Sequence, residues 1–234
     1  MQARPTQNNA NYLNLKRIKN ICDYSKQKTG LALKALLEQT YADLEQQFKR
    51  GIDEKSIIKT KHLKCLRNQS SMFVKEFFIA WEQVIQEFQL QQASAHSFNM
   101  NTLSLVEPEQ LDNEINEKQF IRTFSEEQAS LIKTLCSGLK QIYPGAQFNQ
   151  SSLPFLPLGL AHCTQQAFRN SHFDGALQNQ IERQMTTSFF PKIATLYWGI
   201  KRHFENNGIR LDTYDLQRNT LKPNSNTQHS LSSR

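Results

Sequence analysis

The chain has 234 residues, a formal net charge of +7, and only 8 glycines and 7 prolines beside 15 phenylalanines. So few turn residues argue against sandwiches and barrels and favour long helices. At 38% hydrophobic residues, the composition excludes a wholly disordered chain. There is no signal-peptide pattern and no apolar run long enough to cross a bilayer, so we expect a cytoplasmic protein without a membrane span.

The charges are distributed unevenly along the chain. Residues 1–81 carry 15 basic and 7 acidic side chains, whereas residues 82–129 carry 2 basic and 9 acidic ones. Residues 130–234 are basic again, with 11 against 5. We expect part of the acidic helix that starts near residue 107 to lie near the basic N-terminal helices and to influence how the two halves pack.

The N-terminal region predicts two helices after a short disordered segment. Residues 1–10 are polar and predict disorder. Apolar residues three and four apart predict a helix over 12–25. Gly30 is expected to interrupt the helical pattern before the next helix begins. A second amphipathic pattern predicts a helix over 33–48, with Gly51 as its C-terminal stop.

A longer helix follows. The apolar positions from 66 to 88 stay on one face for many turns and predict a helix over 53–90. The basic helical region therefore covers residues 11–90, and the polar, Gln-rich residues 91–102 predict a linker.

The acidic stretch predicts the start of another helix. Ser104 and Glu107 have capping-box spacing, and Pro108 suits a first helical turn. Carboxylates are favoured there by the helix dipole. The apolar face then continues to Ile142, and Pro144 and its following glycine end the helix.

The remainder predicts two further helical segments. A short helix is expected over 158–170, and a helical period from 177 to 204 should be kinked by Pro191. Residues 103–212 thus form a second helical region, and residues 213–234 predict a disordered tail. Without any persistent two-residue alternation, the sequence predicts an all-α fold, an irregular bundle of about five to seven amphipathic helices.

These helical periods also predict which side chains form the core. The expected buried residues are Leu37, Leu44, Phe73, Phe77, Trp81, Leu131, Leu135, Ile193, Leu196 and Ile200.

One short motif is LSLVEPEQL (103–111), and looser patterns are FFIAWEQVIQEF (77–88), Leu158-Gly159 and the pattern closing at Phe204 and Ile209. In these stretches the sequence resembles a bacterial family known as domain of unknown function 1631. Members are often labelled thymidine phosphorylase without a mechanism and tend to be longer, so this chain looks like a short version without C-terminal parts. The resemblance implies no catalytic residues.

The motifs do not favour an enzyme. Phosphorolysis needs phosphate held by backbone N–H groups, usually from Gly-rich turns, and the sequence has neither GxGxxG nor GxxxxGK[ST]. His62, Cys65, His162 and Cys163 could together form a tetrahedral zinc site, but buried packing explains them better. The four cysteines never form CxxC, so we expect reduced, mostly buried thiols. No catalytic residue, metal or cofactor is predicted.

The basic N-terminal third is the candidate site. Clustered lysines and arginines are typical of surfaces that bind phosphates, and equally of solvated helix faces. The candidate residues for binding nucleic acid or a partner are Lys16, Arg17, Lys19, Lys26, Lys28, Lys61, Lys64 and Arg67.

The favoured function is a non-enzymatic interaction or regulatory module. Long amphipathic helices rich in phenylalanine bury their apolar faces on each other or on a partner. We therefore expect a protein partner or self-association. Nucleic-acid binding through the basic helices is the alternative, and an enzyme is the second alternative.

Overall fold

The architecture was taken from a computed structural model, which describes residues 7–49, 55–93, 122–144, 146, 148–209 and 211. The helical elements are α1 (Gln7–Lys49), α2 (Lys55–Ala93), α4 (Ala129–Ile142), α5 (Pro157–Ser171), α6 (Gly175–Gln184), a π-helix η1 (Met185–Phe189) and α7 (Phe190–Asn206). Residues 122–127 are also helical. The described residues contain no strand, so the predicted all-α fold is confirmed.

The predicted tails and linker fall largely outside these residues. Residues 1–6, 94–121 and 212–234 are not described, so disorder in the tails and a linker between the two regions stay predictions. Two boundaries differ where the structure does describe the chain: α1 already includes residues 7–10, and α2 continues to Ala93.

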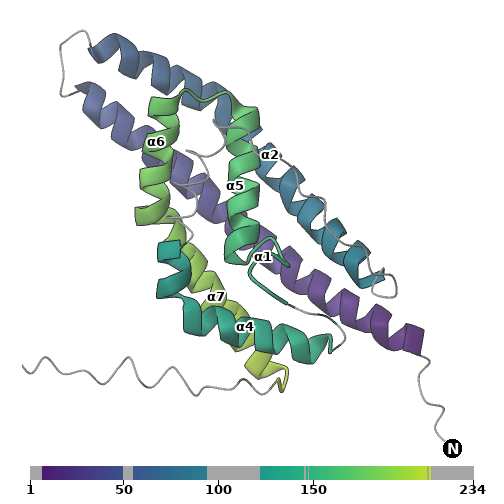
Figure 1. Cartoon of the computed structure of the whole chain (residues 1–234). Helices are drawn as coiled ribbons and strands as arrows, with labels where there is room; N and C mark the ends of the chain where they lie inside the picture. Colours follow the sequence, from purple (N-terminus) through teal and green to yellow (C-terminus); the bar gives the residue numbers. More distant parts are fainter. Residues whose placement is uncertain are drawn as a thin grey trace, which may run out of the picture.

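The first two elements form a long helical hairpin. In Figure 1, α1 and α2 lie side by side and run in opposite directions, with α4, α5, α6 and α7 covering one face of the pair. Helix α5 packs mainly on α2, whereas α7 packs on α1 and α4. The second half of the chain is therefore a layer laid over the N-terminal hairpin.

The continuity of α1 corrects the prediction that Gly30 divides it. The helix runs unbroken through that position. A glycine inside a helix costs only about 1 kcal/mol relative to alanine, which tertiary packing can offset. A Cβ atom at Gly30 would lie 3.4 Å from the Phe78 ring of α2, which is an ordinary van der Waals distance.

The core lies between the hairpin and the covering layer. All ten predicted core residues are buried, and Leu135, Phe73, Phe77, Trp81 and Ile193 have no exposed area. Aromatic rings join the elements as well: the Phe73 centroid lies 5.0 Å from that of Phe168 in α5. This burial confirms the predicted helix faces.

The loop before α5 folds back against the start of that helix. Leu158 donates its backbone N–H to the Gln150 carbonyl at 3.0 Å. A Cβ atom at Gly159 would lie 2.3 Å from the Leu153 carbonyl oxygen and 2.8 Å from Pro154 Cα. Because neither neighbour is a flexible side-chain end, this close approach requires glycine.

The predicted interruption near Pro191 takes the form of the π-helix η1. Phe190 donates its backbone N–H to the Met185 carbonyl, five residues back. Proline in the first turn of α7 has no N–H to donate, so the hydrogen-bond ladder changes there. The predicted stop after α7 is also present, since the helix ends at Asn206 and Gly208 has φ of +73°.

Candidate interaction surface

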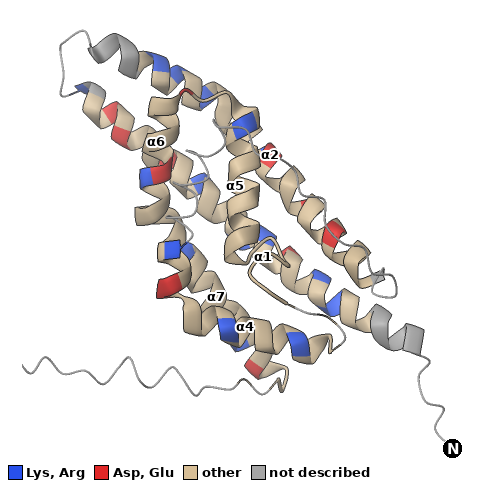
Figure 2. Ribbon diagram, viewed as in Figure 1, with Lys and Arg blue, Asp and Glu red and all other residues tan. Residues whose placement is uncertain are grey.

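The structure divides the predicted basic residues into two groups. Lys16, Arg17, Lys19, Lys26 and Lys28 lie on the first half of α1, whereas Lys61, Lys64 and Arg67 lie near the start of α2. Because the hairpin is antiparallel, the two groups occupy opposite ends of it (Figure 2). Their centres are roughly 35 Å apart at 1.5 Å per residue. They do not form one continuous basic surface.

The hairpin itself provides acidic neighbours for these residues. Lys26 Nζ lies 2.6 Å from Glu82 Oε1 of α2 and 5.4 Å from the centre of the Phe78 ring. In contrast, Glu126 of the acidic stretch pairs with Arg122 at 2.8 Å within its own helix. Residues 107–121, which carry most of the acidic side chains of the predicted helix, lie outside the described residues, so its contact with the basic helices stays a prediction.

A seam between α1 and α7 brings together residues distant in the sequence. The two helices are in contact, and their lining residues pair in antiparallel order. A Cβ atom at Gly199 would lie 2.9 Å from the Tyr24 hydroxyl oxygen, so the glycine permits the tyrosine to lie against α7. We call this surface the α1–α7 seam.

Two hollows lie along the α1–α7 seam. One has a volume of about 490 Å³ and is lined by Tyr24, Lys28, Leu31, Ala32, Lys192, Thr195, Leu196, Trp198, Gly199 and Arg202. The other, of about 290 Å³, is lined by Arg17, Asn20, Ile21, Gln141, Ile142, His203, Asn207 and Ile209. Each hollow has one wall on α1. The opposite wall of the larger hollow is α7, whereas that of the smaller one combines the end of α4, His203 of α7 and the residues that follow α7.

The charged residues lining the α1–α7 seam are of one sign. Among the described residues they are Arg17, Lys28, Lys192 and Arg202, with His203 beside them, and no carboxylate of the described chain lines either hollow. Within the described part of the chain, none of the four cations has a salt-bridge partner. No described carboxylate therefore neutralises their positive field by an ion pair.

Large apolar side chains stand exposed between these cations. Tyr24 is 40% exposed, Leu31 is 60% exposed and Trp198 is 49% exposed. Lysines lie over both aromatic rings: Lys28 Nζ is 5.7 Å from the Tyr24 centroid and Lys201 Nζ is 5.6 Å from that of Trp198. The α1–α7 seam thus combines apolar contact area with positive charge.

Sequence reasoning found only part of this seam. Arg17 and Lys28 are among the predicted residues, but Lys192, Arg202 and Trp198 were missed. Their sequence signal is an exposed flank of α7 opposite its buried positions Ile193 and Ile200. Such a flank shows that these residues face away from the core, but not that α1 lies beside them.

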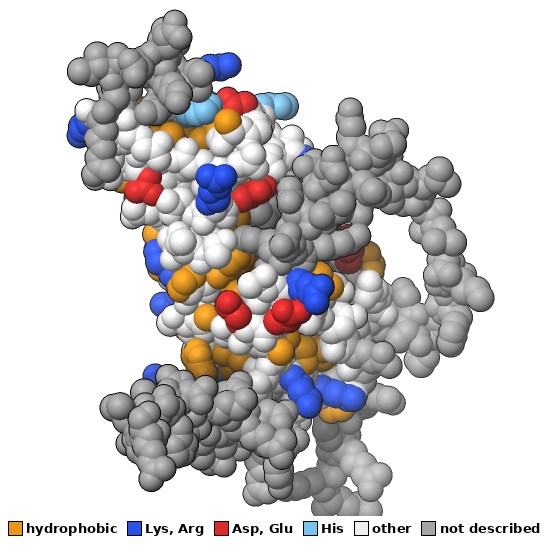
Figure 3. Space-filling view, turned by 60° about the vertical axis from the view of Figure 1, so that its left-hand side comes forward, with side chains coloured by type: hydrophobic (Ala, Val, Ile, Leu, Met, Phe, Trp, Pro, Cys, Tyr) orange, Lys and Arg blue, Asp and Glu red, His pale blue; other side chains and the backbone are white. Residues whose placement is uncertain are grey.

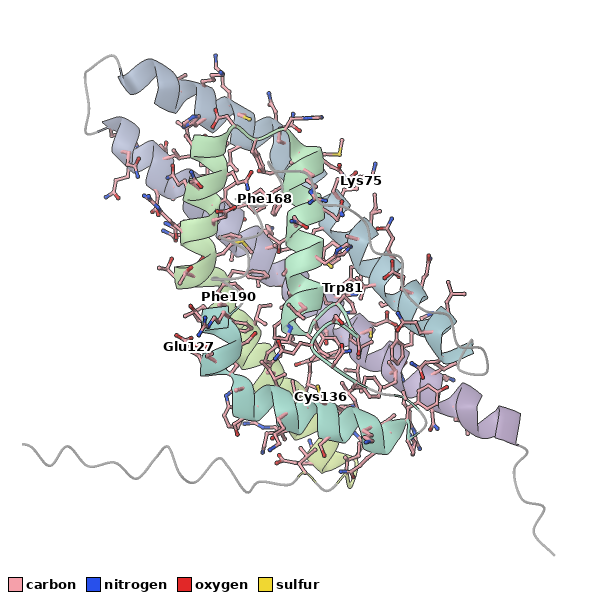
Figure 4. All side chains as sticks on the ribbon, viewed as in Figure 1. Lys75, Trp81, Glu127, Cys136, Phe168 and Phe190 are labelled. Carbon is pink, nitrogen blue, oxygen red and sulfur yellow. The ribbon has the colours of Figure 1, made fainter. Side chains whose placement is uncertain are left out.

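A third hollow has a different character. It has a volume of about 930 Å³ and lies where residues 122–128 meet α6 and the start of α7. Glu127 and Phe190 both line it, and Figure 4 shows them close together. Glu182 and Arg183 add one charge of each sign. Figure 3, which turns the α6 side forward, shows acidic and basic groups near one another. No single ligand charge is favoured.

The cysteines do not provide a nucleophile. Burial raises the pKa of Cys22 and of Cys163 to about 12 and that of Cys136 to about 11. Burial, with a smaller contribution from Asp174, also raises the pKa of Cys65. A thiol reacts as its thiolate, so these side chains stay protonated near neutral pH. All four are free thiols in the structure, as the sequence predicts.

The residues considered for zinc binding do not assemble. Across the described residues, no three His, Cys, Asp or Glu side chains are placed to hold a metal ion. Instead His62 Nε2 lies 3.1 Å from Asp174 Oδ2. The other carboxylate oxygen of Asp174 accepts the Leu177 backbone N–H at 2.9 Å. Asp174 therefore caps α6 and ties it to α2.

This double role can be separated by two substitutions. Asp174→Ala should lower the free energy of unfolding by about 1–2 kcal/mol, because it removes the N-cap and the contact with His62. Asp174→Asn keeps a good capping side chain and should cost less than half as much. Urea denaturation measures both. Equal losses for the two variants would show that the cap contributes little.

The fold and surface define an all-α protein with a basic, partly apolar seam across its two halves. The chain belongs to the DUF1631 family: the description of the matching family model is protein of unknown function (DUF1631) N-terminal domain, and the match covers residues 16–204. No curated protein and no solved structure matches the chain. The LSLV stretch that suggested the family lies outside the described residues, whereas Leu158-Gly159 lies in the first turn of α5. No described helix is long and apolar enough to traverse a bilayer.

Proposed function

We propose that this chain is a non-enzymatic interaction module and that its α1–α7 seam binds an acidic segment of a protein partner. The observation that carries the proposal is the uniform sign of the lining charges beside three exposed apolar side chains. Protein interfaces combine apolar anchors with a polar rim in this way, and Trp, Tyr and Arg are enriched among the residues that dominate binding energy.

The contacts favour a protein partner over nucleic acid. Single-stranded nucleic acid is held by aromatic rings on which bases stack, along a continuous basic track. Here Lys28 and Lys201 lie over the two exposed aromatic rings, and Leu31 is an aliphatic anchor. The second basic group at the start of α2 lies too far along the hairpin to extend the track.

The states of the cysteines and of His62 support the proposal of a non-enzymatic role. The thiols are held protonated by burial. Within the described chain, His62 pairs with a helix-capping carboxylate rather than with a nucleophile. Nucleophilic catalysis needs an activated group beside its base. These cysteines and His62 do not support the phosphorylase label attached to some relatives.

Site-specific photo-crosslinking tests the proposal. A photoreactive side chain replacing Thr195, which is exposed in the α1–α7 seam, should capture a protein in a lysate of the native cells. The double variant Lys192→Glu/Arg202→Glu should lose that product, because charge reversal repels an acidic partner. The matched control replaces Lys75, which is exposed on α2 and points away from the covering layer (Figure 4).

Two results would contradict the proposal. A product that disappears on nuclease treatment would assign the seam to nucleic acid. Equal products from Thr195 and Lys75, unaffected by the charge reversal, would show that the seam has no special affinity. A protein product specific to Thr195 and sensitive to the reversal supports it.

A further inference from the structure

The length and the walls of the α1–α7 seam indicate the shape of the protein segment that it would bind. Its α1 wall runs from Arg17 to Leu31, which corresponds to about 21 Å of helix axis. Helix α7 forms most of the other wall, from Lys192 to His203, which is about 17 Å of helix axis. The end of α4 and the residues after α7 continue this wall. A groove between two antiparallel helices is the usual site for a third helix, whose apolar face enters the groove.

The exposed apolar residues have the spacing that a helix would meet. Tyr24 and Leu31 are seven positions apart on α1, so they lie on nearly the same side of that helix, two turns apart. Trp198 stands on the facing helix α7, half exposed. An amphipathic helix meets such anchors with residues at i, i+3 or i+4, and i+7.

The cations lie on both walls of the α1–α7 seam. Arg17 and Lys28 belong to α1, whereas Lys192 and Arg202 belong to α7. The nearest acidic residue on α7, Glu205, is paired with Lys201, and Asp23 on α1 lines neither hollow. A helix seated between these walls would meet positive charge along both edges of its apolar face.

We infer that the ligand of the α1–α7 seam is an acidic amphipathic helix of about four turns, with leucine-like residues along one stripe and carboxylates on both flanks. This inference rests on the proposed function and adds the conformation and the pattern of the bound segment. Electrostatic attraction accelerates the encounter, and the apolar anchors provide affinity that salt does not screen.

The test uses synthetic probes on the full chain. The first probe is a labelled peptide of about 18 residues with leucine at i, i+3, i+7 and i+10 and glutamate at most other positions. The second has the same composition with the leucines redistributed, so that no helical face is apolar. The third is a single-stranded oligothymidylate of about 12 nucleotides. Fluorescence anisotropy measures affinity for each.

Trp198 provides a second readout at the surface itself. The sequence has two tryptophans, and Trp81 is fully buried whereas Trp198 is 49% exposed. Acrylamide quenching therefore reports mainly on Trp198. The patterned peptide should protect it and bind at least tenfold more tightly than the redistributed peptide. Circular dichroism should show the peptide becoming helical on binding.

Two sets of variants locate the binding. Lys192→Glu/Arg202→Glu should weaken the patterned peptide about tenfold or more, and Leu31→Ala should weaken it several-fold. The matched controls are Lys64→Glu/Arg67→Glu, at the other end of the hairpin, and Leu90→Ala, whose side chain is 65% exposed on α2. These controls should leave affinity unchanged.

The outcomes separate the two proposals. Equal binding of the two peptides, with protection of Trp198, would overturn the amphipathic helix while leaving an acidic protein ligand. Tighter binding of the oligothymidylate than of either peptide, lost on the α7 charge reversal, would overturn both. Both proposals would also be overturned if no probe protected Trp198 from quenching and crosslinking at Thr195 captured no protein.

Discussion

Replacing Trp81 with alanine is expected to lower the free energy of unfolding by about 3–5 kcal/mol. The side chain has no exposed area, and its ring lies 6.1 Å from the Phe77 centroid and 6.0 Å from the Phe78 centroid. Its indole nitrogen has no hydrogen-bond partner in the described structure. The loss should therefore come from packing and the cavity rather than from a broken hydrogen bond.

Urea denaturation followed by circular dichroism measures this effect. The matched control is Trp198→Ala, since that tryptophan is half exposed and should cost less than about 1 kcal/mol. Trp81→Phe should fall between the two because it leaves a smaller void. A loss below about 1 kcal/mol for Trp81→Ala would contradict the burial of this side chain.

Replacing Gly159 with alanine should destabilise the protein by roughly 1–3 kcal/mol, toward the upper end of that range. The added Cβ would lie 2.3 Å from the Leu153 carbonyl oxygen. Relief requires the backbone of the loop before α5 to move, which would also disturb the hydrogen bonds to the Gln150 carbonyl. The loss should exceed the gain of about 1 kcal/mol in helix propensity that alanine brings.

A second glycine supplies the control for this substitution. Nothing lies within 4 Å of a Cβ atom built on Gly175, in the first turn of α6. Gly175→Ala should therefore be neutral or slightly stabilising. Thermal unfolding of both variants distinguishes steric overlap from a general effect of glycine. An unchanged melting temperature for Gly159→Ala would show that the loop does not constrain this position.

Much of the fold could be predicted because helical periodicity is a local property. The spacing of apolar residues identified the core faces, and Pro191 identified the interruption before α7. Gly30 was misread as a break, since the cost of one glycine inside a helix is only about 1 kcal/mol and the packing of a long helix can offset it. A single sequence cannot show which helix face will lie beside which.

The candidate surface was less predictable for the same reason. Charge runs showed Arg17 and Lys28, but Lys192 and Arg202 join them only after the chain has crossed back over α1. The expected contact between the acidic helix and the basic helices stays a prediction, since most of its carboxylates lie outside the described residues. The sequence does not state that the hairpin turns back on itself and sets Glu82 beside Lys26.

The raised pKa values of the thiols have a chemical consequence for the whole bundle. With a pKa of about 12 for Cys22 and Cys163, only about one side chain in 100,000 is a thiolate at pH 7. Oxidants and alkylating agents react with the thiolate, so they should react very slowly with these two cysteines while the helices stay packed. These two thiols, unlike the partly buried Cys65 and Cys136, therefore become available to such reagents only when the helices that bury them separate.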